Sequence, residues 1–322
     1  MAKYNKSDAR SYCKENMKGI WAAIPYPFDA NDNIDEEAYR KDIRHYIDNL
    51  NIKGFFVGGM IGEFWCMTKE ERLRGQEISC DEAGDVPIIA HTGHTSAKEA
   101  LELTEAAEKA GATYAILANP YLGAQGHPDR VKAFFKYLCD GSDLGISLFN
   151  TAATGYSLSP ELVRELVAEN ETICCIKNAQ PKSHCDEVRK AVGDDIVVSD
   201  PMETQWFFNR AYHKQQTFMS GPDPFLYQRK NDLKMQKYTD LIDEGNLEEA
   251  WTVRDAMNSI RDVSEKWIWG PWSRGAFPIP ALKPWMEFMG LSGGPSRPPM
   301  IPLTSDEKKE LETDLRHVGL ID

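Results

Sequence analysis

Hydrophobic residues gather in eight short runs that are spread along the chain and separated by longer amphipathic segments. The runs lack a strict alternation of polar and apolar positions, and each ends in Gly, Pro, Asn or Asp. Such runs are typical of strands that are buried on both faces of a parallel sheet. The predicted strands lie at residues 19–25, 54–59, 87–93, 114–120, 145–150, 174–178, 196–200 and 216–221.

The segments between these runs predict helices with recognisable starts. Thr68 stands three residues before Glu71, which is the spacing of a capping box. Ser159 places a capping hydroxyl before Pro160 at the first helical position. Residues 96–112 carry an apolar stripe at helical spacing and stop at a glycine near their end. Strand and helix therefore alternate along this part of the chain.

Eight strands that alternate with helices predict an α/β fold with a parallel sheet, and eight is the number that closes a (β/α)8 TIM barrel. A doubly wound sheet of eight strands is the alternative. We expect the barrel to occupy residues 1–225 as one unit.

The pattern changes beyond the eighth run. Residues 227–267 predict helix throughout, and residues 270–291 mix turns with another helix. Residues 293–322 predict a proline-rich linker and a capped terminal helix. We therefore expect a C-terminal helical region at residues 226–322 that packs on the barrel and has no catalytic centre of its own. Three tryptophans are expected to pack this region or a subunit interface: Trp267, Trp269 and Trp272.

Composition narrows the class of protein. The 322 residues are 42% hydrophobic and 27% charged, as in an ordinary globular protein, and the net charge of −13 argues against nucleic-acid and anionic-membrane partners. Residues 1–19 have no apolar stretch that would form a secretory signal, and no window approaches the roughly 18 apolar residues of a membrane span. Seven scattered cysteines without a CxxC pair indicate reduced thiols. We expect a cytoplasmic protein.

Lys177 stands directly after the apolar residues of the sixth predicted strand. In a parallel barrel the C-terminal ends of the strands form the mouth where catalytic side chains gather. Burial there disfavours the ammonium form, and a neutral amine is the form that attacks a carbonyl carbon. Lys177 is therefore a candidate Schiff-base nucleophile. The alternative is a lysine one residue past the strand whose amine reaches bulk water.

The glycine-rich segment Gly58–Glu63 (GGMIGE) closes the second predicted strand. Glycines at that place let backbone N–H groups converge on an anionic group such as a substrate carboxylate. A tight turn before the helix that begins near Thr68 accounts for the same residues. The segment alone leaves both interpretations open.

Four segments, in this order, resemble the dihydrodipicolinate synthase and N-acetylneuraminate lyase superfamily. GGMIGE followed by TKEER is similar to its GTTGE…L-T-x-E-E segment, and FNTAATG (149–155) stands where the superfamily has YNxPxxTG. IKNAQ (176–180) stands at its IKEA, and GGPSRPPMIPLT (293–304) at its G-x-x-RPP-x-x-P-L stretch. The likeness runs from about residue 18 to 320 and so covers nearly the whole chain.

The resemblance implies a (β/α)8 barrel with a C-terminal helical region, in a homo-oligomer that is a tetramer or a dimer. It implies that Lys177 forms a Schiff base with pyruvate or another 2-oxo acid. The carboxylate of that small-molecule substrate is expected at the backbone N–H groups of Gly59, Met60 and Ile61. Schiff-base catalysis needs no metal, and no cofactor is expected.

The chain also departs from the superfamily pattern. The tyrosine that relays protons falls on Phe149, which has no ionisable group. The two threonines of the glycine-rich turn fall on Met60 and Ile61, and the loop 150–155 is one residue shorter and lacks an arginine for a second carboxylate. Diaminopimelate-pathway synthesis and ordinary sialic acid cleavage are both disfavoured. A mouth reshaped around a larger or more apolar substrate is favoured.

Two tyrosines are candidate catalytic residues in place of the missing hydroxyl. Tyr121 follows the fourth predicted strand, and Tyr156 follows the shortened loop. Tyr26, His91 and His94 also end strands and are further alternatives for holding the proton. The competing interpretation of each tyrosine is a packed residue at the rim of the barrel.

The HxxH spacing of His91 and His94 raises the question of a metal site, with Glu63 or Asp200 as further ligands. The two histidines lie on a turn and not at the helical i, i+4 spacing. Because the imine chemistry does not need a metal, no metal is predicted.

Other strand-end residues are candidates for contacting the substrate, with turn formation or helix capping as the alternative explanation. An acid at the mouth of strand 7 or 8 would polarise a substrate hydroxyl. The candidates for substrate binding are Phe149, Asn150, Asn178 and Ser220, and the acids are Asp200, Glu203 and Asp223.

Three functions remain open from the sequence. The first is a class I lyase or hydratase-aldolase that makes or breaks a carbon–carbon bond through an imine at Lys177. The second uses the same imine for dehydration, deamination or decarboxylation of a 2-oxo acid. The third is a non-catalytic ligand-binding barrel, which the loss of the relay tyrosine at Phe149 keeps open. Borohydride trapping separates the enzymes from the binder, and product analysis separates the two enzymes.

Overall fold

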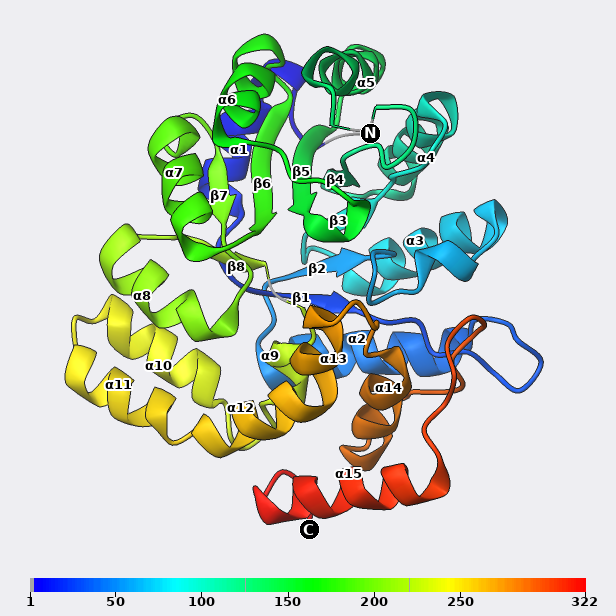
Figure 1. Cartoon of the computed structure of the whole chain (residues 1–322), viewed down its shortest axis with the longest axis vertical. Coiled ribbons are helices and arrows are strands. Elements are labelled where there is room, and N and C mark those ends of the chain that lie inside the picture. The colour runs from blue at the N-terminus through cyan, green and yellow to red at the C-terminus, as the bar shows by residue number, and fades with distance from the viewer. Residues whose placement is uncertain (1–2, 125, 220) are drawn as a thin grey trace.

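The computed structural model describes residues 3–124, 126–219 and 221–322, and it shows an eight-stranded parallel sheet in the order β7-β6-β5-β4-β3-β2-β1-β8 (Figure 1). Each observed strand overlaps its predicted run. The strands are β1 (Gly19–Ile24), β2 (Gly54–Val57), β3 (Ile88–His91), β4 (Tyr114–Ala118), β5 (Gly145–Thr151), β6 (Ile173–Ala179), β7 (Val197–Ser199) and β8 (Thr217–Met219).

The sheet closes into a barrel because its first strand pairs with its last. β1 lies in register with β2 on one side and with β8 on the other. Between β7 and β8 a side chain makes the connection: Ser199 Oγ accepts a hydrogen bond from Met219 N at 3.0 Å and donates to Thr217 O at 3.3 Å. The predicted (β/α)8 barrel is confirmed, and the doubly wound alternative is wrong because neighbours along the chain are neighbours around the whole sheet.

Helices cover the outside of the barrel and begin where the sequence predicts. Thr68 and Glu71 form a reciprocal capping box, and Ser159 Oγ accepts a hydrogen bond from Leu162 N at 3.2 Å. The helices between strands are α2 (Glu36–Leu50), α3 (Lys69–Ala83), α4 (Ala97–Ala110), α5 (Pro128–Gly141), α6 (Pro160–Glu169), α7 (Lys182–Val192) and α8 (Glu203–His213), and short 3₁₀ turns are η2 (Phe64–Cys66) and η3 (Ala152–Thr154).

The N-terminal segment closes the end of the barrel opposite the mouth. It consists of η1 (Lys6–Asp8) and α1 (Ala9–Asn16). Arg10 donates hydrogen bonds to the carbonyl oxygens of Asn170 and Ile173, where β6 begins. Gln216, which precedes β8, donates to Lys14 O and to Met17 O. The C-terminal ends of the strands are therefore the open end.

The C-terminal region is helical, but the prediction of one continuous helix over residues 227–267 is wrong. Residues Arg229 and Asp232 form an isolated bridge instead of a helical turn, and Gly245 adopts a φ of +86° that ends a helix. Among the described residues no helix is long and apolar enough to cross a membrane. The elements are α9 (Asp223–Leu226), α10 (Lys234–Asp243), α11 (Leu247–Asp255), α12 (Asn258–Ser264), a π-helical turn η4 (Glu265–Trp269), α13 (Gly270–Ser273), α14 (Ile279–Phe288) and α15 (Ser305–His317).

The predicted cap of the terminal helix is confirmed, because Thr304 and Glu307 form a reciprocal capping box at the start of α15. The predicted division between residues 225 and 226 falls inside the short helix α9, whose residues are buried in the common core. The helices from α10 to α15 lie along one side of the barrel, next to α8, β1 and α2 (Figure 1).

Buried charges tie the C-terminal region to the turn that follows β2. Lys283 Nζ lies 2.5 Å from Glu63 Oε1, and both side chains are almost fully buried. Arg297 donates its backbone N–H to Glu63 Oε2 at 3.3 Å and places its guanidinium 2.7 Å from Glu71 Oε1. The ring of Phe28 lies under both cations, 4.2 Å from Lys283 Nζ and 3.9 Å from Arg297 Cζ. The C-terminal region therefore holds the glycine-rich turn in place.

Candidate active site

Lys177 lies within β6, in register with Phe149 on β5 and Ser199 on β7. Side chains at paired positions of neighbouring parallel strands point to the same face. Lys177 therefore projects into the barrel, and only 5% of the residue is exposed. The alternative of a lysine that lies past the strand and reaches bulk water is wrong.

Two aromatic rings lie beside the amine of Lys177. Its Nζ lies 4.7 Å from the ring centroid of Phe56 and 5.3 Å from that of Phe149, and the two rings meet edge to face at 5.6 Å. Burial lowers the pKa of Lys177 to about 7, against the opposing electrostatic effects of Asp223 and Cys175. The neutral amine needed for attack on a carbonyl carbon is thus well populated at neutral pH.

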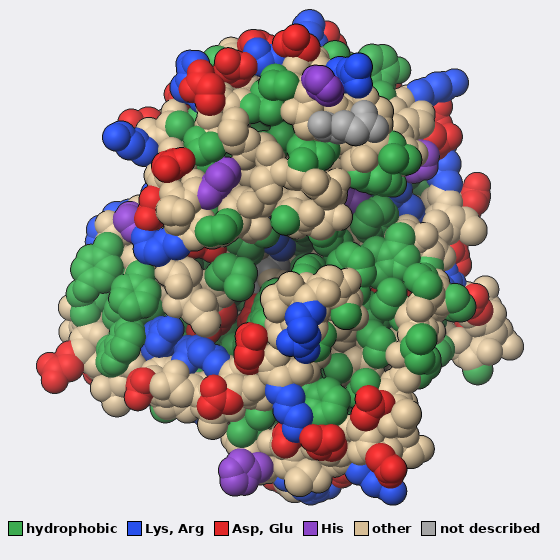
Figure 2. Space-filling model, viewed as in Figure 1, with side chains coloured by type: hydrophobic (Ala, Val, Ile, Leu, Met, Phe, Trp, Pro, Cys, Tyr) green, Lys and Arg blue, Asp and Glu red, His purple; other side chains and the backbone are tan. Residues whose placement is uncertain are grey.

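Lys177 opens into a cavity of about 620 Å³ at the mouth of the barrel. Ala23, Met60 and Ile61 contribute to one wall, and the aromatic residues of the C-terminal region form another. Figure 2 shows this face of the molecule hollowed near its middle, with hydrophobic side chains gathered around the hollow. The catalytic candidate therefore lies at the base of a largely apolar cavity.

The tryptophans of the C-terminal region have two different environments. Trp267 packs within the region and donates a hydrogen bond from Nε1 to Asp314 Oδ2 at 2.8 Å, as expected from the sequence. Trp269 and Trp272 instead line the Lys177 cavity. Trp269 and Trp272 also pack within the region, with ring centroids 5.5 Å apart. Their place at the Lys177 cavity, to which the π-helical turn and α13 bring them, is an addition that the sequence did not predict.

The turn after β2 borders the same cavity and contains backbone donors that are unpaired in the described part of the chain. Within the described residues, the N–H groups of Met60 and Ile61 have no hydrogen-bond acceptor, and both side chains line the cavity. Gly58 has a φ of +66°, and a Cβ atom at Gly59 would lie 2.5 Å from the ring of Phe56. Glycine is therefore favoured at both positions, and the two consecutive unpaired N–H groups are the kind of donor that turns use to bind an anion.

Of the three acids predicted at the mouth, Asp223 is the one whose charge affects the pKa of Lys177. It is fully buried, accepts a hydrogen bond from Trp269 Nε1 at 2.8 Å, and raises the pKa of Lys177 through its charge. The other two carboxylates have structural partners. Asp200 accepts from Asn209 Nδ2, and Glu203 forms a buried ion pair with Arg261.

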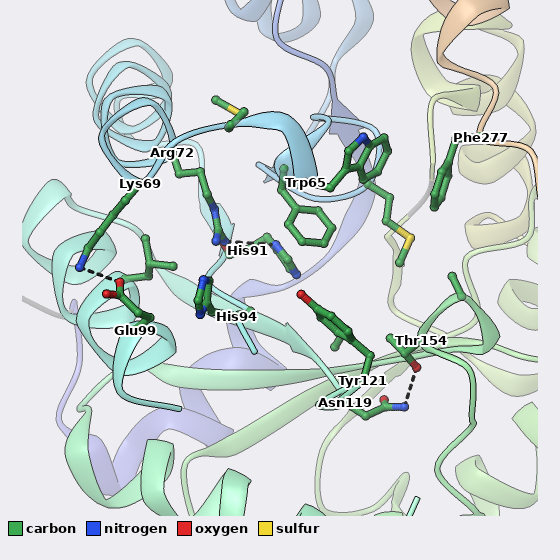
Figure 3. A pocket seen from close by; sticks show the side chains of 17 residues that line it. Trp65, Lys69, Arg72, His91, His94, Glu99, Asn119, Tyr121, Thr154 and Phe277 are labelled. Atoms are coloured by element: carbon green, nitrogen blue, oxygen red, sulfur yellow. Dashed lines mark hydrogen bonds and ion pairs between the residues drawn. The ribbon is translucent and has the colours of Figure 1, made fainter. Parts of the chain in front are cut away.

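A second cavity of about 430 Å³ adjoins the first, and the two share Met60, Ala153 and Phe277 as lining residues. The hydroxyl of Tyr121 points into this second cavity, toward His91 and His94 (Figure 3). Tyr121 therefore lines the adjoining cavity and not the cavity that holds Lys177.

The two histidines belong to the wall of the second cavity. Burial, and then the charge of Arg72, lower the pKa of His91 to about 3, so that its ring is neutral. His94 Nδ1 accepts a hydrogen bond from Ser96 N at 3.0 Å. The proposed further ligands are engaged elsewhere, Glu63 with Lys283 and Asp200 with Asn209. No group of three metal-ligating side chains occurs in the described part of the chain.

Three other predicted residues line neither cavity. Tyr156 donates its hydroxyl to Pro120 O at 2.8 Å. Asn150 donates to Asn178 Oδ1 at 2.8 Å and binds both backbone groups of Leu158, which ties β5 to β6. Their roles in substrate binding or proton transfer stay predictions. Ser220 lies outside the described residues.

Sequence reasoning missed Phe56 and the aromatic wall. Successive side chains of β2 point to opposite faces of the sheet, and all of them are apolar. The face that Phe56 occupies can therefore be assigned only from the register of β2 with β1 and β3. Phe277 belongs to no motif and reaches both cavities through the fold of the C-terminal region. The spacing of Trp269 and Trp272, three residues apart on helical turns, is the one available signal for a shared face.

A model of the dihydrodipicolinate synthetase family matches residues 16–206 of this chain. The chain belongs to this family. The match contains seven of the eight barrel strands together with Lys177, so the family resemblance seen in the short motifs is confirmed.

Individual family members share part or all of the chain. An N-acetylneuraminate lyase of Clostridium perfringens is 32% identical over 186 residues, which is 57% of this chain and 64% of the lyase. A 4-hydroxy-tetrahydrodipicolinate synthase of Methanococcoides burtonii is 25% identical over 95% of this chain and 99% of its own length. A prophage protein of the family from E. coli K12, solved in complex with pyruvate, superposes with a TM-score of 0.82 at 22% identity over 94% of this chain and 99% of that chain.

The depressed pKa of Lys177 makes the stability of this family member depend on pH. Between about pH 7 and 10.5 the unfolded chain binds a proton at this lysine that the folded chain does not, so stability rises with pH in that window. Below about pH 7 the folded protein holds a buried ammonium ion, and its free energy of unfolding is lowered by the full desolvation penalty of that ion. We expect Lys177→Met to be more stable than the wild type at pH 7, by on the order of 4 kcal/mol, with the gain vanishing toward pH 10.5.

Urea unfolding at a series of pH values measures this effect. Lys98→Met, at a side chain that is 80% exposed, is the control and should show the same small difference at every pH. A stability difference for Lys177→Met that does not change with pH contradicts the account of the buried amine.

Proposed function

We propose that the protein is a class I aldolase-type lyase in which Lys177 forms an imine with a 2-oxo acid related to pyruvate. One observation carries the proposal. A lysine with a pKa of about 7 lies inside a barrel strand, between two aromatic rings, at the base of a cavity. Membership in the dihydrodipicolinate synthetase family supports it, because its relatives are named as lyases and synthases.

The chemistry follows from the neutral amine. Nζ of Lys177 attacks the C2 carbonyl carbon of the 2-oxo acid, and the carbinolamine loses water to give a protonated imine. In a substrate that carries a hydroxyl on C4, that hydroxyl gives up its proton to water or to Tyr121 as it becomes the carbonyl of the leaving aldehyde. The C3–C4 bond breaks, the imine accepts its electron pair, and an enamine forms between C2 and C3. Protonation of C3 and hydrolysis then release the shortened 2-oxo acid and restore the amine. No cofactor is needed, because the imine itself holds the electrons.

We place the substrate carboxylate on the turn after β2. The N–H groups of Met60 and Ile61 have no acceptor within the described residues and border the cavity that holds Lys177. The side chains of Met60 and Ile61 are apolar, so the backbone supplies the hydrogen bonds. The anchoring of this turn by Lys283 and Arg297 supports a preorganised site.

We assign Asp223 the task of stabilising the protonated imine. Its buried carboxylate favours positive charge at Lys177 Nζ, and Trp269 holds the carboxylate by a hydrogen bond. The negative charge of Asp223 is therefore already in place when the neutral amine becomes a positively charged iminium ion. For the mobile proton we propose water or Tyr121, whose hydroxyl points into the adjoining cavity. Tyr156 enters this role only if its bond to Pro120 O breaks.

We also propose that the enzyme is a cytoplasmic homo-oligomer, either a dimer or a tetramer. Association is supported by two apolar side chains beside the second cavity, Tyr121 and Leu122, which are 41% and 62% exposed. Burial of such neighbouring side chains against another copy removes apolar surface from water.

Borohydride trapping tests the proposed function. We expect incubation with pyruvate and sodium borohydride to add the reduced keto acid irreversibly to the peptide that contains Lys177, as seen by mass spectrometry. Lys283, which is also buried but paired with Glu63, is the internal control and should remain unlabelled. Labelling at another lysine, or none with a panel of 2-oxo acids, would sink the proposal. Product analysis then separates carbon–carbon cleavage from dehydration, deamination or decarboxylation, which begin from the same imine.

Restoring the family tyrosine tests whether the site is rebuilt or merely damaged. Phe149 and Phe56 meet edge to face in the largely apolar lining of the cavity, and a hydroxyl added to Phe149 enters these surroundings at a cost of about 1–3 kcal/mol if it finds no partner. We expect Phe149→Tyr to reduce turnover of the natural substrate or leave it unchanged, and Lys177→Ala to abolish it. A gain of about tenfold or more from Phe149→Tyr would identify a degraded version of the usual site.

A further inference from the structure

The wall of the Lys177 cavity that the C-terminal region contributes is aromatic. Trp269 and Trp272 line it with ring centroids 5.5 Å apart, and Phe277 continues the array 5.6 Å from Trp272. The same Phe277 stacks on Trp65 at 4.5 Å, at the border with the second cavity. Flat apolar surfaces of this kind bind flat apolar groups.

The backbone is adapted to bring these rings over the mouth. Trp269 closes the π-helical turn η4, and such turns often re-aim side chains at functional sites. A Cβ atom at Gly221 would lie 2.9 Å from Trp269 Cη2, and one at Gly270 would lie 2.4 Å from Glu265 O. Glycine at these two positions therefore allows the close approach of the indole to the end of β8 and the tight passage from η4 to α13. The indole is also held by its bond to Asp223.

The charges and hydrogen-bonding groups of the cavity are few. Among the described lining residues, Lys177 is the cation, and Glu265 at the mouth is the anion. The lining thus offers no second cation for a carboxylate or phosphate on the far end of a substrate. Among the lining residues that the structure describes, Thr151 and Ser273 carry hydroxyls, too few to satisfy the several hydroxyl groups of a sugar chain.

The cavity has room for a substrate larger than pyruvate. Its volume of about 620 Å³ lies within the range of about 300–1,000 Å³ that is typical of sites for drug-sized ligands. A three-carbon keto acid bound between Lys177 and the Met60–Ile61 turn leaves most of that volume to the part of the substrate beyond C3.

We propose that the natural substrate is a 2-oxo acid whose far end is a neutral aromatic group that packs against Trp269, Trp272 and Phe277. The proposal rests on imine formation at Lys177. In the cleavage direction the leaving aldehyde is then aromatic, and in the synthetic direction an aromatic aldehyde is the acceptor. Glu265 disfavours an anionic tail by like-charge repulsion.

Trapping of a matched series of 2-oxo acids tests the substrate class without assuming a reaction direction. The series contains pyruvate, 2-oxo-4-phenylbutanoate with an aromatic tail, 2-oxoglutarate with an anionic tail, and a 2-oxo-3-deoxy sugar acid with a polyol tail. The readout is the concentration that gives half-maximal borohydride labelling of Lys177. We expect the aromatic acid to need about a tenfold lower concentration than each of the others.

Variants of the wall locate the tail. Trp272→Ala should raise the half-maximal concentration of the aromatic acid at least about fivefold and leave that of pyruvate unchanged. Trp251→Ala, at an exposed tryptophan of α11 that lines neither cavity, is the matched control and should change neither value. Ser273→Lys, at an exposed lining residue, should improve labelling by 2-oxoglutarate and so reports on the same wall even if Trp272→Ala folds poorly.

The outcomes are distinguishable. Labelling by pyruvate with no preference for the aromatic acid over the anionic and polyol acids overturns the inference and leaves the proposed function intact. Equal effects of Trp272→Ala on pyruvate and on the aromatic acid also overturn it, because the wall would then not contact the tail. Failure of every acid to label Lys177 overturns the proposed function, and the inference falls with it.

Discussion

The active site depends on keeping one lysine amine away from water. Lys177 projects into the barrel from the middle of a short stretch of parallel strands, where Phe56 and Phe149 occupy the space that water would need to solvate an ammonium ion. Its lowered pKa is the direct consequence. The nearby carboxylate of Asp223 acts in the opposite direction, so the amine is neutral enough to attack and the resulting iminium ion still has a counter-charge.

The C-terminal helical region is part of this site and not an appendage to it. Lys283 and Arg297 reach back to Glu63 and hold the turn that borders the cavity. Trp269, at the end of the π-helical turn, donates a hydrogen bond to Asp223 and lines the Lys177 cavity. A truncation that removes the region would therefore change the electrostatics of the lysine, the anion site and the apolar wall together.

The sequence predicted those features that local chemistry determines. Each buried strand is a compact apolar run with a polar end, so all eight strands and the position of Lys177 were recognisable. Features that depend on distant packing were not. The face of Phe56 follows from strand register, the bond from Tyr156 to Pro120 follows from loop geometry, and the cavity wall at Trp269 comes from a segment 92 positions beyond Lys177. The prediction of one helix over residues 227–267 was wrong because the helical periodicity of the sequence continues across Gly245 and Ala256, where the chain leaves one helix and begins another.

The neutral amine of Lys177 is the central claim, and its proton affinity is measured most directly by the pH dependence of carbamylation with cyanate. The rate at Lys177 is divided by the rate at exposed lysines in the same sample, so that the chemistry of the reagent and the fixed accessibility of the cavity cancel. Because exposed lysines deprotonate at about pH 10 and Lys177 at about pH 7, the ratio should be level at its highest value below about pH 6 and fall steadily above about pH 7. A ratio that stays constant from about pH 6 to 10 would show that Lys177 titrates like any surface lysine, and the account of a buried nucleophile would be wrong.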